Sequence, residues 1–265
     1  MTEKQILTME DIQVSDILYY DPDFQEDCYS FCAKREIDCV PALEDSMKIY
    51  VRQPEKHGFV EEIVADERIV NSSINIFSPE LVDKFANHHL LLVFSDNSLS
   101  GVVHFSDYNR SVVSIYLYKI FLAYEKALRA VLHKHGYKNE NMIEYFREMS
   151  AKLEGRGRNF YERKIKDYST KSGDLKQLLP FQSFYLKDLI GLAEYNRILF
   201  VDNRVNDLRN MVMHAHEFVS MEDPTSANLI YNFETFKRFF GLATILHNDY
   251  KRVANHLAFL NPETI

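Results

Sequence analysis

Apolar residues recur at three- and four-residue steps through the second half of the chain, from about residue 114 onward. This spacing places apolar side chains along one face of an α-helix. The first such stripe consists of Leu117, Ile120, Phe121, Tyr124, Leu128, Val131 and Leu132. The same pattern predicts helices over 139–153, 181–195, 203–219 and 226–257, and glycines mark 154–175 as an irregular connection. Residues 114–265 are therefore predicted to form an all-α helical bundle.

The first half has a different pattern, in which short β-branched or apolar runs alternate with turns and short helical stretches. In chain order it predicts a helix over 24–34, strands over 38–43, 48–51 and 74–77, a helix over 78–85, and strands over 90–94 and 101–105. Two α/β cycles of similar order indicate an internal repeat. The predicted fold class is α+β, with an α/β domain at 1–113 and a helical domain at 114–265.

Charge separates the same two halves. The chain has a net charge of −8, but residues 1–113 carry a net of −12 and residues 114–265 a net of +4. Within the second half, seven basic residues between 152 and 171 face only three acidic ones. A positive local charge of this kind can hold phosphate groups, although a solvated helix face is the simpler interpretation. The two halves are expected to have different partners.

Several classes of protein are disfavoured. No apolar run approaches the roughly 20 residues of a membrane helix, and the start MTEKQILTMEDIQ lacks the order of a signal peptide. We therefore expect a cytoplasmic protein with no membrane partner. The clustered Cys28, Cys32 and Cys39 do not match a disulfide framework or a zinc site, so they are predicted to be small core residues.

Three stretches of the first half resemble CBS modules, which pair into a disc that often binds adenine nucleotides. These are VSDILYYDP and AKREIDCVPAL for a first module, and HHLLLVFSDNSLSGVVHFSDYNR for a second. The family's phosphate- and ribose-facing pattern places Gly101 and Asp107 at nucleotide-binding positions, while His104 replaces its hydroxyl residue. The corresponding stretch 48–54 of the first module lacks both the Gly and the Asp. The resemblance implies at most one site, for an adenine nucleotide acting as a regulatory ligand.

The stretch 206–217, NDLRNMVMHAHE, carries the candidate chemistry of the second half. Its apolar positions recur at helical spacing, whereas Arg209, Asn210 and His214 lie off that stripe. An imidazole can transfer protons near neutral pH, and a guanidinium can stabilise charge that builds up on phosphate oxygens. Holding both on a rigid helix is what a catalytic site requires.

This stretch resembles the signature of HEPN ribonucleases, which is an Arg followed by four to six residues and a His, usually with a polar residue directly after the Arg. Arg209, Asn210 and His214 match it, and Glu125 resembles the acidic position of the family's first helix. The resemblance covers roughly residues 114–260. It implies a metal-independent endoribonuclease of the toxin or phage-defence type. Such an enzyme lets the RNA 2′-hydroxyl attack, leaves a 2′,3′-cyclic phosphate, and acts as a homodimer.

Alternatives stay open. His216 is a second histidine within the signature's spacing, in a supporting role, and it stands where some relatives carry a Tyr. His214 and His216 project about 200° apart on a helix and cannot share a metal ion, so no catalytic cofactor is expected. Arg209 could instead pair with Asp207 or Glu217 in a purely structural role. The protein would then be a non-catalytic, nucleotide-responsive regulator whose helical half only dimerises or binds RNA.

Overall fold

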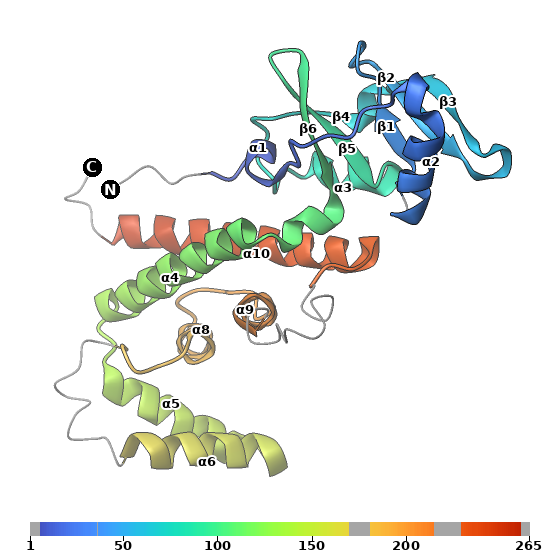
Figure 1. Ribbon diagram of the computed structural model, residues 1–265. Helices are drawn as coiled ribbons and strands as arrows, with labels where there is room; N and C mark the ends of the chain where they lie inside the picture. The colour runs from blue at the N-terminus through green and yellow to red at the C-terminus, as the bar shows by residue number, and fades with distance from the viewer. Residues whose placement is uncertain (1–5, 36, 170–180, 215–228, 261–265) are drawn as a thin grey trace. The chain divides into compact units, whose positions relative to one another are not determined.

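The computed structural model describes residues 6–35, 37–169, 181–214 and 229–260. Two compact units make up the chain. The first comprises Met1–Ser114 and Asn228–Phe240, and the second comprises Ile115–Ala227 and Gly241–Ile265. The fold is mixed α+β, because the first unit holds two small sheets and the second is helical (Figure 1).

The first unit contains two cycles of similar topology. The elements of the first cycle and its flanks are α1 (Met9–Ile12), η1 (Pro22–Phe24), α2 (Gln25–Lys34), β1 (Cys39–Pro41), β2 (Lys48–Gln53), η2 (Pro54–Lys56) and β3 (Gly58–Ile63). Those of the second are η3 (Asp66–Arg68), β4 (Ile69–Asn71), α3 (Glu80–Asn87), β5 (Leu90–Ser95), β6 (Ser98–His104) and η4 (Phe105–Asn109).

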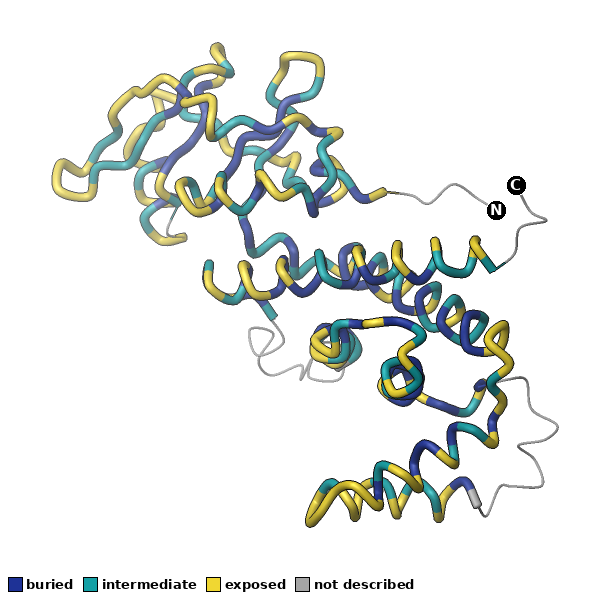
Figure 2. Tube along the Cα trace, turned by 180° about the vertical axis from the view of Figure 1, so that it is seen from behind, coloured by how far each residue is buried: buried dark blue, intermediate teal, exposed yellow. Residues whose placement is uncertain are grey.

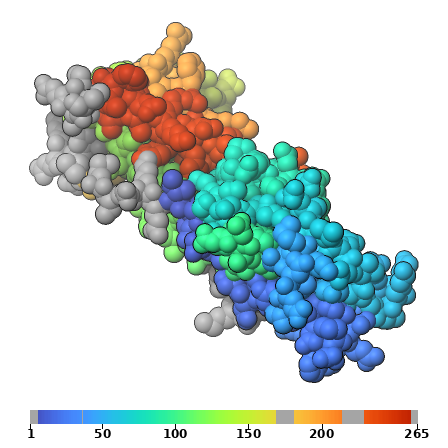
Figure 3. Space-filling model, turned by 90° about the horizontal axis from the view of Figure 1, so that it is seen from above, coloured from blue at the N-terminus to red at the C-terminus, as the bar shows by residue number. Residues whose placement is uncertain are grey.

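In each cycle, a short extended segment pairs in parallel with the strand that follows a helix, and that strand then pairs antiparallel with the next. Tyr20 bridges Ala42 in parallel across α2, and β1 pairs antiparallel with β2. Likewise β4 pairs in parallel with β5 across α3, and β5 pairs antiparallel with β6. The predicted order of a helix followed by two strands therefore occurs twice, although the strand before α3 is β4 and not the predicted 74–77. Figure 3 shows the surfaces of the two cycles, coloured from blue to green, next to each other.

The core of the first unit is shared by both cycles. Cys39, Ile49 and Val64 pack with Leu92 and Phe94, so the two sheets bury side chains against each other. In a second cluster, Cys28 and Cys32 of α2 pack with Val40 of β1. All three cysteines are buried free thiols, and burial raises the pKa of Cys32 to about 12. The prediction that the cysteines are core residues is thus confirmed.

Residues from the end of the chain complete the first unit. The aromatic ring of Phe236 is fully buried, 5.1 Å from that of Phe85 and 5.0 Å from that of Tyr108. The Asn109 side chain donates to Ile230 O and accepts from Ile230 N, at 2.7 Å and 3.0 Å. The first unit therefore includes residues 228–240 as well as the N-terminal part of the chain.

The second unit is built from helices throughout its described part. They are α4 (Ser111–Lys134), α5 (Asn139–Lys152), α6 (Gly155–Ser169), α8 (Leu186–Tyr195), α9 (Val205–His214) and α10 (Phe233–Phe259), of which α4 and α10 begin in the first unit. The apolar stripe predicted along α4 is buried except for Ile120, which is half-buried (Figure 2). In the part of the chain that the structure describes, no helix is long and apolar enough to cross a membrane.

Some element predictions were wrong. The segment 154–169, expected to be irregular, forms α6, because Tyr161 and Tyr168 pack on Phe146 of α5 and outweigh the local glycines. Residues 74–77 do not form a strand, since Asn71 and Asn75 accept backbone hydrogen bonds from Ser73 and Phe77 and turn the chain. Strands β3 and β4 were not predicted.

Candidate functional site

Helix α9 places the central residues of the predicted site. Asp202 accepts a hydrogen bond from Arg204 N at 3.0 Å in the turn before the helix begins. Val205, Leu208 and Val212 are buried at helical spacing, as predicted. Arg209 and Asn210 lie off this stripe, Arg209 half-buried and Asn210 exposed. His214 is the last helical residue of α9; its side chain, and all of His216 and Glu217, lie outside the described residues.

The Arg209 guanidinium faces a carboxylate of α4. Its Nε lies 3.4 Å from Glu125 Oε1, in a pair whose side chains are 28% and 13% exposed. Among the described residues this buried Nε makes no hydrogen bond, so charge rather than a directed bond holds it beside Glu125. Arg209 thus pairs with Glu125, which lies far away in the sequence, rather than with its helix neighbour Asp207. The structure brings these two predicted site residues together.

Glu125 is itself held in place from its other side. Arg129, one turn further along α4, contacts Glu125 Oε2 through an NH2 group at 3.0 Å. The same guanidinium donates to the carbonyl oxygens of Phe181 and Phe184, at 3.2 Å and 3.3 Å. No role for Arg129 was predicted from the sequence, although its position four residues after Glu125 is the usual spacing of an ion pair on a helix.

The arrangement gives one fixed carboxylate between two guanidinium groups. Arg129 has its donors engaged by two carbonyls and by Glu125. Among the described residues, Arg209 pairs only with the Glu125 carboxylate, so its other donors can bind a further anion. A phosphate group is the ligand that a planar guanidinium suits best. In the ranges that the structure describes, no group of three or more His, Cys, Asp or Glu residues could hold a metal ion.

The predicted nucleotide-binding residues of the first unit lie at the end of β6. Asp107 Oδ2 accepts from His104 N at 2.8 Å, and its Oδ1 lies 3.4 Å from Arg110 Nε. Burial raises the pKa of the Asp107 carboxyl, and the bond from His104 N and the charge of Arg110 oppose that rise. At Gly101 a Cβ would lie 2.7 Å from the Gln13 side chain, so the glycine permits a close approach within the unit. Both residues thus have structural contacts at these positions.

His104 lies at the same turn and predicts a pH dependence. Its Nδ1 accepts from Ser106 N at 3.2 Å, and burial together with the charge of His89 lowers its pKa from the usual 6.5. Protonation is therefore disfavoured in the folded state, so the stability that His104 contributes is present above about pH 6.5 and is lost as the pH falls through the lowered pKa. We expect the melting temperature of His104→Asn to fall less steeply between pH 7.5 and 5.5 than that of the wild type.

The asparagine carbonyl can still accept from Ser106 N, so this variant keeps the turn. The matched control is His57→Asn, at an exposed position with a φ of 48° that asparagine tolerates. Its melting temperature should follow the wild-type pH dependence. Equal slopes for all three proteins would show that His104 is not the titrating group.

No protein-family model matches this chain, and neither does a curated protein or a solved structure.

Proposed function

We propose that this protein is a metal-independent endoribonuclease that acts on single-stranded RNA in the cytoplasm. The observation that carries the proposal is Arg209, whose side chain is 28% exposed and pairs, among the described residues, with the Glu125 carboxylate, on the helix that ends at His214. A cation for phosphate and a proton-transfer group within two turns of one helix are the parts that RNA cleavage needs. The likeness of this pattern, and of Glu125, to HEPN ribonucleases supports the same function.

In the proposed reaction the RNA supplies its own nucleophile. A histidine removes the proton from a 2′-hydroxyl, whose oxygen forms a bond to the adjacent phosphorus while the bond from phosphorus to the 5′-oxygen breaks. The leaving 5′-oxygen takes a proton, which gives a 2′,3′-cyclic phosphate and a free 5′-hydroxyl. Arg209 stabilises the charge on the phosphate oxygens. Glu125 positions Arg209, and Asn210 supplies a hydrogen-bonding group one turn from His214.

Cleavage needs both a general base and a general acid. The signature in one chain supplies one Arg and one His. We therefore propose that two copies of the chain act as a homodimer, so that the second His214 supplies the missing proton. Toxin or phage-defence systems are the setting that the HEPN likeness suggests. The test of this proposal is whether Arg209→Ala and His214→Ala lose cleavage.

The ion pair between Arg209 and Glu125 also supports a second candidate function. The charge of Arg209 is matched by Glu125, and that of Glu125 by Arg129, as in an ion-pair network that only stabilises a helical bundle. The helical half would then dimerise or bind RNA without cleaving it. The same variants decide between the two functions, because a structural pair affects the melting temperature and not catalysis.

For the first unit we propose a regulatory role in which an adenine nucleotide binds near Asp107. The repeated α/β topology supports the likeness to a CBS pair. In that likeness Asp107 matches the position that faces ribose. Binding requires the Asp107 carboxylate to exchange its contact with Arg110 for ribose hydroxyls. We expect millimolar AMP, ADP or ATP to raise the melting temperature by mass action.

The variant Asp107→Asn should lose that nucleotide-induced shift, since it removes the charge but keeps an acceptor for His104 N. Asp96→Asn, in the exposed turn between β5 and β6, is the matched control and should keep the full shift. If no nucleotide shifts the wild-type melting temperature, the first unit is a structural or protein-binding module.

A further inference from the structure

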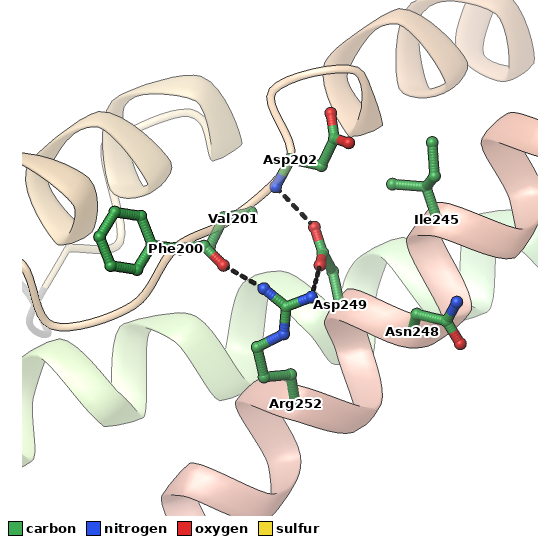
Figure 4. Close-up of a pocket in the computed structure, with 7 residues that line it drawn as sticks. All are labelled: Phe200, Val201, Asp202, Ile245, Asn248, Asp249 and Arg252. Atoms are coloured by element: carbon green, nitrogen blue, oxygen red, sulfur yellow. Dashed lines mark hydrogen bonds and ion pairs between the residues drawn. The ribbon is translucent and has the colours of Figure 1, made fainter.

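A pocket of about 340 Å³ opens between the segment that leads into α9 and the middle of α10 (Figure 4). It is lined by Phe200, Val201, Asp202, Ile245, Asn248, Asp249 and Arg252. Its volume falls in the range of about 300–1,000 Å³ that is usual for ligand pockets. All of its lining residues belong to the second unit.

The Arg252 guanidinium is fixed as a flat platform in this pocket. One terminal NH group donates to Phe200 O, and the other lies 3.2 Å from Asp249 Oδ1. Asp249 has a side chain only 3% exposed, and its second oxygen accepts from Asp202 N at 2.8 Å. Both terminal nitrogens of the guanidinium are therefore engaged, while 53% of the Arg252 side chain remains exposed.

Each carboxylate in the lining of this pocket is paired with an arginine. Asp249 pairs with Arg252, and Asp202 pairs with Arg204 at 2.6 Å. The lining therefore offers no unpaired cation to attract a free anion. What it offers is one planar guanidinium, the exposed amide of Asn248 and the aromatic ring of Phe200, which is 76% exposed. Flat, neutral molecules with polar edges suit such a set of groups.

We propose that this pocket binds one unpaired nucleobase of single-stranded RNA. Unpaired bases stack on aromatic rings and on guanidinium planes, and their edges accept hydrogen bonds from side-chain amides. Phe200 and Arg252 provide the stacking surfaces, and Asn248 provides an amide that can pair with the edge of an adenine. The proposal rests on the proposed function, because it names where the substrate of that site is held.

The pocket lies close to Arg209 along the fold. Asp202 is three residues before α9 begins, and the rise from Val205 to Arg209 is about 6 Å. The segment that lines the pocket thus leads directly into the helix that carries Arg209, so a base held in the pocket would help to position the strand at Arg209.

The test measures binding rather than cleavage. Full-length protein carrying His214→Ala is titrated against fluorescein-labelled A12 and U12 RNA, with anisotropy as the readout. Phe200→Leu, which removes the ring but keeps an apolar side chain, should weaken binding of A12 about tenfold, whereas Phe200→Tyr should bind within about twofold of the parent. Asn248→Ala should reduce the preference for A12 over U12. Tyr231→Leu, at another exposed aromatic residue, should change nothing.

The outcomes distinguish the proposed base-binding pocket from the proposed nuclease. Equal binding by Phe200→Leu and the parent protein overturns the pocket, even if Arg209 and His214 prove essential for cleavage. Binding that depends on Phe200 in a wild-type protein that cuts no RNA supports the pocket and overturns the nuclease. A complete lack of binding to single-stranded RNA overturns both. Phe200 is largely exposed, so its variants should keep the wild-type melting temperature.

Discussion

Cleavage of single-stranded RNA should be lost when either Arg209 or His214 is replaced by alanine. Removal of a group that stabilises charge in the transition state costs about 10²–10³ in rate, and loss of general acid–base catalysis costs about 10²–10⁴. The two losses should not add in the double variant, since both groups act in the same step. The assay follows a labelled RNA and the appearance of the 2′,3′-cyclic phosphate end.

Matched controls separate this effect from a general loss of positive charge or of imidazole. Arg238→Ala and His133→Ala remove exposed side chains elsewhere and should cleave at the wild-type rate. His216→Ala should have a milder effect than His214→Ala, and an equal effect would mean that His216 is the proton-transfer group. Arg209 lies off the apolar stripe of α9, so its removal should open no large cavity, and circular dichroism should show an unchanged fold.

The chemistry can be checked with the substrate and with the state of the protein. EDTA should not reduce the rate, and RNA with a 2′-O-methyl group at the cut site should survive because it lacks the nucleophile. Cleavage of that RNA, or a requirement for a divalent ion, would contradict the mechanism. Light scattering of the active protein should give the mass of a dimer, and an active monomer would contradict the composite site.

The largest expected loss of stability comes from Asp188→Ala in the second unit. Lys164 of α6 and Asp188 of α8 form an ion pair whose side chains are 16% and 3% exposed. The Lys164 ammonium also lies 5.2 Å from the ring centroid of Phe146 and 5.0 Å from that of Phe160. Removing one partner of a buried pair leaves the other charge unmatched, which costs about 3–5 kcal/mol of the free energy of unfolding.

Two comparisons make this prediction specific. The double variant Lys164→Met with Asp188→Leu should regain most of the lost stability, because it leaves no buried charge. Glu162→Ala breaks the exposed pair with Arg158, whose side chains are 61% and 48% exposed, and should cost less than about 1 kcal/mol. Urea unfolding gives these values. A similar small cost for Asp188→Ala would show that solvent reaches the Lys164 charge.

The sequence by itself determined the elements whose signal is local. The apolar stripes of α4 and α9, including Val205, Leu208 and Val212, repeat at the period of the helix that buries them. The two α/β cycles and the burial of the cysteines were also predicted. These features depend on residues that are close together in the chain. A helix with a periodic apolar face buries that face whichever element it packs against.

Tertiary structure decided the rest. The sequence 155–169 is polar and contains glycine, and it forms α6 because aromatic residues of α5 cover one of its faces. The pairing of Arg209 with Glu125 rather than Asp207, and the hydrogen bond from Arg252 to Phe200 O, join residues far apart in the chain. A side chain's partner depends on which helices pack together, and no local pattern encodes that choice.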